Sequence, residues 1–174
     1  MKSNIDRSKS LQELEQQDWG EPTYHSSLVT TCHRLRRKPL NQFTVGDLQI
    51  MIGQQISLPI LVPLALERLE DEPLAEGRYY PGDLLGAVLK IDERFWSNHA
   101  DSFQRIRRVV CRVREILPSL DEVIRPDAQR LLEEVPRSLT TMEPKIGNEE
   151  IERRLRDGGG RSLAEILADL EKEV

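Results

Sequence analysis

The stretch that decides the fold is "QIMIGQQISLPILVPLALERL", residues 49–69, the most apolar part of a chain in which 32% of the residues are charged. A helix needs ~20 consecutive apolar residues to span a bilayer. The longest unbroken apolar run here is Leu58–Leu66, which contains two prolines and is followed directly by Glu67 and Arg68. We therefore predict that this segment fills a protein core. The sequence leaves open whether it also faces a partner.

The composition is that of a folded protein with a polar surface. The 174 residues suffice for one domain and an appendage, because domains most often have ~100–150 residues. Hydrophobic residues make up 38% of the chain, too many for general disorder. The net charge of −5 disfavours non-specific attraction to nucleic acid or anionic lipid and is compatible with a basic partner.

The cysteines and the N-terminal sequence favour a reduced compartment. The chain has two cysteines, Cys32 and Cys111, and neither has a second Cys or His at the spacing of a metal site. The opening "MKSNIDRSKSLQEL" has no apolar run that could serve as a signal peptide. We expect a cytoplasmic protein without a metal or cofactor.

Helical signals recur along the chain and predict an all-α fold, a compact multi-helix bundle. The strongest is a capping box, in which Thr44 caps a helix from Val45 and Asp47 answers three residues later, with Phe43 and Leu48 placed as a hydrophobic staple. Gly53 marks either the end of this helix or a close approach of another one.

Further helices are expected on both sides of that segment. One ends near Gly20, a second carries Leu28, Cys32 and Leu35 on one face, and a third begins at Ser57 with Pro63 in its first turn.

After these come a helix in residues 79–90, a long one from Asp92 to the residue before Pro118, and a short one at 127–134. The residues expected to be buried are Leu48, Ile52, Ile56, Leu61, Leu66, Leu69, Leu85, Val88, Phe103, Ile106, Val110 and Val113.

We divide the chain into a disordered N-terminus (1–9), a helical domain (10–141) and a flexible C-terminal extension (142–174). The extension should contain two short amphipathic helices, one capped by Asn148 and one by Ser162, on either side of three consecutive glycines. Such helices cannot bury their own apolar stripes, so we expect them to dock on the domain or on another chain. We expect limited proteolysis to cut near Pro144 or at Gly158–Gly160 and to leave a folded fragment that ends near residue 135–145.

No arrangement of residues indicates catalysis. Cys32 and His33 are neighbours, but successive residues on a helix point ~100° apart, which suits a core cysteine and a surface histidine better than a reactive pair. Nucleophile-elbow, zinc-protease and phosphate-loop motifs are all missing from the sequence. We expect no catalytic, metal-binding or cofactor-binding residues.

Two basic clusters could bind phosphates, but they lack interleaved aromatic residues, and solvated helix faces explain them more simply. They are Arg34, Arg36, Arg37 and Lys38, and Arg105, Arg107, Arg108, Arg112 and Arg114.

Acidic residues crowd the C-terminal end of the apolar helix, where the macrodipole disfavours negative charge by about 0.3–1 kcal/mol each at exposed positions. A placement that costs stability is a candidate binding feature. The alternative is a solubilising loop after a buried helix, and both interpretations stay open. We call these residues the acidic ridge: Glu67, Glu70, Asp71, Glu72 and Glu76.

Four motifs occur in order: "LRRKPL" (35–40), "FTVGDL" (43–48), "IGQ" (52–54) and "PLALERL" (63–69). With their surroundings, residues 10–96, they resemble a helical family of immunity proteins from bacterial contact-dependent growth inhibition systems. The resemblance implies a cytoplasmic protein that binds and neutralises, without catalysis, the cognate toxin domain of a large exported protein. Residues 142–174 have no counterpart in it, so they could be an addition, a second interaction element or a remnant of another gene.

The resemblance does not locate the toxin interface. Many toxins of such systems are nucleases, whose substrate clefts must be positive, so the acidic ridge could imitate a phosphate backbone and occlude the cleft. Affinity would need packed anchors. The expected partner-binding residues are the acidic ridge with Tyr79, Tyr80 and Trp96.

The competing interpretation is a nucleic-acid-binding regulator that places its arginine-rich helix on phosphates and uses the C-terminal extension as a dimerisation arm. Salt-sensitive binding to DNA or RNA would favour it. An enzyme ranks third.

Overall fold

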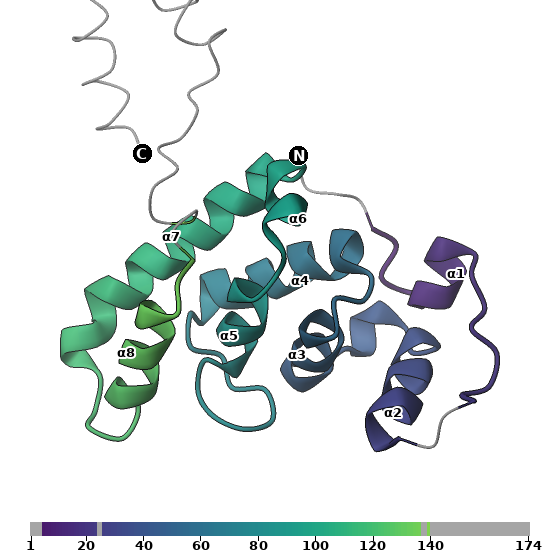
Figure 1. Cartoon of the computed structure of the whole chain (residues 1–174), viewed down its shortest axis with the longest axis horizontal. Helices are drawn as coiled ribbons and strands as arrows, with labels where there is room; N and C mark the ends of the chain where they lie inside the picture. The colour runs from purple at the N-terminus through teal and green to yellow at the C-terminus, as the bar shows by residue number, and fades with distance from the viewer. Residues whose placement is uncertain (1–4, 24–25, 137–138, 140–174) are drawn as a thin grey trace, which may run out of the picture. The chain divides into compact units, whose positions relative to one another are not determined.

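The computed structural model describes residues 5–23, 26–136 and 139, which belong to a compact unit of residues 1–139. Within the described residues, helices are joined by loops and 3₁₀ turns, and no strand is present (Figure 1). The predicted all-α fold is therefore confirmed. The helices are α1 Leu11–Glu15, α2 Ser27–Arg36, α3 Val45–Gly53, α4 Leu58–Asp71, α5 Asp83–Leu89, α6 Glu93–Ser97, α7 Ala100–Ile116 and α8 Arg125–Glu133, with 3₁₀ turns at Leu40–Gln42 and Leu117–Ser119.

The apolar segment lies at the centre of this unit. α3, α4 and α5 contact one another, α7 packs on α4, and α8 packs on α7. Figure 1 shows α1 and α2 towards one end of the unit and α7 and α8 towards the other. Leu61, Leu66 and Leu69 of α4 have no exposed surface. All of the expected core residues are buried except Ile56, which is partly buried.

The predicted start of α3 is confirmed. The Asp47 backbone N–H donates to the Thr44 hydroxyl at 3.2 Å, and the Asp47 carboxylate accepts from the Thr44 N–H at 3.0 Å. Phe43 and Leu48 on either side of this cap are buried. α3 ends at Gly53, where a Cβ would meet nothing within 4 Å, so the glycine marks a helix end and not a close helix crossing.

α4 begins abruptly, after Gln55 and Ser57 in the left-handed backbone region at φ of 58° and 51°. Pro63 lies well inside the helix and not in its first turn, so that part of the sequence interpretation was wrong. Proline has no N–H to donate to the carbonyl four residues earlier, that of Pro59. The buried apolar face of α4 outweighs this loss.

Three other expectations need correction. The long helix expected from Asp92 is two helices, because the chain turns at Asn98 and His99, where the His99 ring stacks on Phe95 at 4.0 Å. α1 ends at Glu15, well before Gly20, because Gln16 takes a left-handed conformation. Leu28 is 41% exposed and does not share the buried face of α2.

The described part of the N-terminal segment, residues 5–9, contacts the domain. The backbone carbonyls of Arg7 and Lys9 accept from the N–H groups of Asn41 and Leu40 at 2.8 and 3.0 Å. Ile5 packs against the core. The C-terminal extension, residues 142–174, lies outside the described residues.

Candidate functional site

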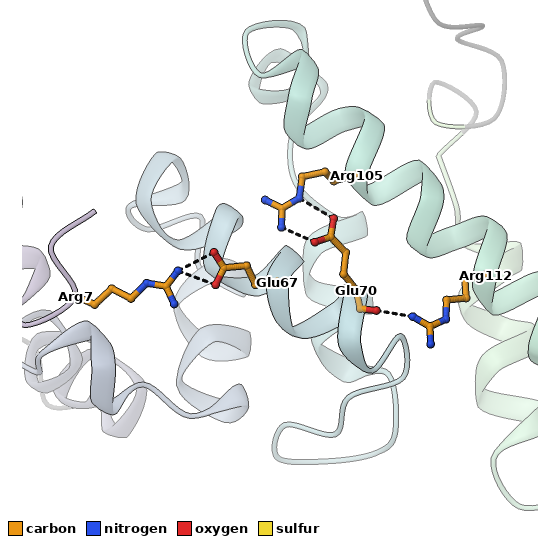
Figure 2. A network of polar contacts seen from close by, with 5 residues as sticks. All are labelled: Arg7, Glu67, Glu70, Arg105 and Arg112. Carbon is orange, nitrogen blue, oxygen red and sulfur yellow. Dashed lines mark hydrogen bonds and ion pairs between the residues drawn. The ribbon is translucent and has the colours of Figure 1, made fainter. Parts of the chain in front are cut away.

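The acidic ridge separates into two groups, and the first is used within the domain. The Glu67 carboxylate accepts two hydrogen bonds from Arg7 Nη2, both at 2.7 Å (Figure 2). The Glu70 carboxylate accepts from Nε and Nη2 of Arg105, also at 2.7 Å. These carboxylates therefore tie the N-terminal segment and α7 to α4.

Arg112 completes this network by donating to the backbone carbonyl of Glu70 in the last turn of α4. The two guanidinium groups of α7 thus compensate for acids at the negative end of the α4 macrodipole. The hydrogen bond to Glu70 raises the pKa of Arg105; burial of the guanidinium opposes this rise, and the charges of Glu70 and Glu67 add to it.

The second group consists of the ridge residues Asp71, Glu72 and Glu76, whose side chains are exposed. Among the described residues, no hydrogen bond or ion pair joins their carboxylates to another side chain. All three lie at the end of α4 or in the loop of residues 72–82 that leads to α5, which we call the α4–α5 loop. They are the part of the ridge that is open to a partner.

The three aromatic candidates have different environments. Tyr79 is 70% exposed on the α4–α5 loop. Tyr80 is partly buried, and the guanidinium of Arg130 from α8 lies 5.4 Å from its ring centre. Trp96 is only 5% exposed and packs edge-on against Phe103, so it belongs to the core and offers no surface to a partner.

Asp83, at the first position of α5, holds the α4–α5 loop, and sequence reasoning missed it. The residue is 3% exposed, and its carboxylate accepts hydrogen bonds from the backbone N–H groups of three successive residues: Gly77 at 2.6 Å, Arg78 at 2.8 Å and Tyr79 at 3.0 Å. The usual aspartate turn gives no signal for this contact, because there the side chain bonds an N–H group two residues later, whereas the donors to Asp83 lie four to six residues before it.

The loop is also packed closely against α3 and α8. A Cβ at Gly46 would lie 2.9 Å from Cγ of Arg78. Gly82 has φ of +91°, which favours glycine, and a Cβ there would lie 2.5 Å from Cδ1 of Leu131. The Gly82 N–H donates to the Ala75 carbonyl at 3.3 Å across the base of the loop. The exposed side chains of the loop are therefore carried by a fixed backbone.

The basic cluster on α2 is mostly used internally. Arg36 is 2% exposed, pairs with Glu15, donates to the Gln17 carbonyl at 3.0 Å, and stacks on Trp19 at 4.2 Å. Arg37 and Lys38 form ion pairs with Glu21 and Asp47, and Arg34 is exposed. On α7, exposed guanidinium groups occur at Arg108, Arg112 and Arg114, and Arg107 is partly buried.

The Cys32–His33 pair shows no catalytic geometry. Burial raises the pKa of the Cys32 thiol, while Nδ1 of His33 lies 3.1 Å from the Gly20 carbonyl oxygen. The part of the chain that the structure describes contains no group of three or more His, Cys, Asp or Glu residues that could hold a metal ion. None of its helices is long and apolar enough to cross a membrane.

A helical domain that presents acids and a tyrosine on a fixed loop has the features of a protein-binding module. The family comparison agrees, and the chain belongs to the family of CDI (contact-dependent growth inhibition) immunity proteins, whose model matches residues 13–106. The match runs from within α1 to the first part of α7 and includes the whole α4–α5 loop. A search of curated proteins found no match to the chain.

Proposed function

We propose that this protein binds its cognate CDI toxin through the α4–α5 loop and occludes the active site or substrate cleft of the toxin. Family membership supports an immunity role and the binding of a cognate CDI toxin. The observation that carries the proposed interface is that Asp71, Glu72, Glu76 and Tyr79 are exposed while the backbone beneath the loop is fixed by Asp83.

Charge provides the proposed recognition of the toxin. A nuclease toxin needs a positive cleft to hold a phosphate backbone, and carboxylates at the end of α4 can take the place of phosphates in that cleft. Opposite potentials speed the encounter of two proteins more than they tighten the complex. The acids should therefore act mainly on the association rate.

Tyr79 is the proposed anchor. Interface residues that dominate affinity are enriched in tyrosine, tryptophan and arginine, and they lie where a partner can exclude water from them. At 70% exposure the Tyr79 ring has most of its surface left to bury. Its loss should act mainly on the dissociation rate.

The proposed interface is smaller than the one expected from the sequence. Glu67 and Glu70 hold the domain together through Arg7 and Arg105, and Trp96 is buried. Tyr80 lies beside the interface, where its ring is already covered in part by Arg130. Neutralisation by occlusion needs no catalytic residue in the immunity protein, and we propose that it takes place in the cytoplasm, where a delivered nuclease would act.

The test uses the cognate toxin domain, inactivated for binding measurements and active for survival assays. We expect Glu72→Lys with Glu76→Lys to slow association, and Tyr79→Ala to speed dissociation, each weakening the complex by about 10-fold or more. Cells that produce the active toxin should lose protection in proportion.

A matched control carries the same change of charge elsewhere. Glu115→Lys with Glu122→Lys alters two exposed acids, one on α7 and one in the segment that follows it. This control should bind like the unmodified protein. If the loop variants keep an unchanged circular dichroism spectrum and unchanged affinity at low salt, the interface lies elsewhere.

A further inference from the structure

We infer that Asp83 is the positioning residue of the toxin-binding loop: it never touches the toxin, and it fixes the backbone that presents Tyr79 and Glu76. This inference rests on the proposed function. Asp83 is 3% exposed, so a partner docked on the loop cannot reach its carboxylate. Its effect on binding must therefore pass through the residues it holds.

The hydrogen-bond geometry supports this role. The N–H groups of Gly77, Arg78 and Tyr79 converge on the two oxygens of one carboxylate, at 2.6, 2.8 and 3.0 Å. Successive backbone N–H groups that point to one anion form a compact site for negative charge. Hydrogen bonds to an ionised acceptor are shorter and stronger than those between neutral groups. The last of the three donors is the backbone of Tyr79 itself.

The surroundings leave the carboxylate little freedom to move. A Cβ at Gly77 would lie 2.7 Å from Oδ1 of Asp83. The loop backbone therefore approaches the carboxylate as closely as a residue without a side chain allows. The Asp83 backbone N–H donates to the Tyr80 carbonyl at 3.1 Å, which closes the turn from the other side. The fixed loop lowers the conformational entropy that binding would otherwise lose.

The charge on Asp83 is needed, and not only its volume. Asparagine has nearly the same shape, but it offers one acceptor oxygen and turns an NH₂ donor towards N–H groups that are donors themselves. Asp83→Asn should therefore keep the helix and its packing while it releases at least one loop N–H. Because the change is isosteric, it separates positioning from core packing.

The first measurement is amide hydrogen exchange of the free, full-length protein, which needs no toxin. In Asp83→Asn we expect exchange at residues 77–79 to become at least about 10-fold faster, with no change at the amides of α3 and α7. Unchanged protection at residues 77–79 would overturn the inference. Gly77→Ala is a second variant that disturbs the same contact from the loop side, should Asp83→Asn fail to fold.

The second measurement is binding to the inactivated toxin domain. We expect Asp83→Asn to weaken binding by about 10-fold or more, as expected for loss of pre-organisation. Ile106→Val, a fully buried change on α7, serves as the control for lowered thermal stability and should bind normally.

The outcomes separate the two proposals. One outcome is that Tyr79→Ala and the paired lysine variant of Glu72 and Glu76 lose affinity for the toxin, while Asp83→Asn shows faster exchange at residues 77–79 and binds normally. This outcome would refute the positioning role and leave the proposed interface standing. If none of these variants loses affinity, the proposed interface itself is refuted. Faster exchange at residues 77–79 together with weaker binding by Asp83→Asn supports both.

Discussion

Glu70 should stabilise the domain without contributing to toxin binding, which is contrary to its place in the acidic ridge expected from the sequence. Glu70→Gln keeps the shape of the side chain but removes the charge that two guanidinium nitrogens of Arg105 contact at 2.7 Å. Charged hydrogen bonds contribute about 1.5–3 kcal/mol each, and exposed ion pairs about 0.2–1 kcal/mol.

The pair lies between these limits, since the side chains of Arg105 and Glu70 are 23% and 37% exposed. After a discount for solvent screening, we expect Glu70→Gln to lower the free energy of unfolding by about 1–2 kcal/mol. For a domain of this size the corresponding drop in midpoint temperature is about 3–10 °C.

Urea unfolding followed by circular dichroism measures this change, and the dependence on urea should keep its slope. Combining the variant with Arg105→Gln should give a coupling energy of about 1 kcal/mol. A change in the free energy of unfolding within about 0.3 kcal/mol of zero for Glu70→Gln would refute the pairing. A double variant whose change equals the sum of the two single changes would refute it as well. A loss of toxin affinity as large as that of the loop variants would show that the acidic ridge is one binding surface after all.

Three further predictions concern single side chains. Gly53→Ala should raise the free energy of unfolding by about 0.5–1 kcal/mol in the same urea assay, because the site is helical and a Cβ there meets nothing; a destabilised variant would contradict this. Iodoacetamide should modify the exposed Cys111 in the folded protein and reach the buried Cys32 only on unfolding, as mass spectrometry would show; equal labelling of both would count against the buried position. Burial raises the pKa of Asp47, but hydrogen bonds from Lys38 and Thr44 outweigh burial and leave this pKa below the usual aspartate value. A depressed pKa in the folded state stabilises the fold above the unfolded-state pKa, so this contribution should be lost as the pH falls below about 4, and Asp47→Asn should flatten that part of the profile of stability against pH.

Local signals in the sequence predicted local structure well. The capping box of Thr44 and Asp47 involves residues three apart, and the apolar stripe of α7 follows the helical period, so both can be read without knowledge of the fold. The break between α6 and α7 has no proline or glycine to mark it. The contact observed there, the stacking of His99 on Phe95, joins residues only four apart, and no motif in the sequence announces it.

The site was harder to predict, because its charges find partners far away in sequence. Glu67 is paired across 60 residues and Glu70 across 35, and no local pattern shows which acids on a helix end are paired. Asp83 is different, since its partners are only four to six residues before it, but the usual aspartate turn bonds N–H groups that follow the side chain and so does not reveal them. Trp96 is an aromatic residue near the acidic ridge in sequence, and nothing local in the sequence shows that the core buries it.

The most direct test of the account is amide hydrogen exchange of the full chain with and without the inactivated toxin domain. The account predicts that the toxin slows exchange at residues 71–80, the end of α4 and the loop held by Asp83, more than at other amides of the helical domain. Protection concentrated on the exposed arginine face of α7 or in residues 142–174, with exchange at residues 71–80 unchanged, would contradict it.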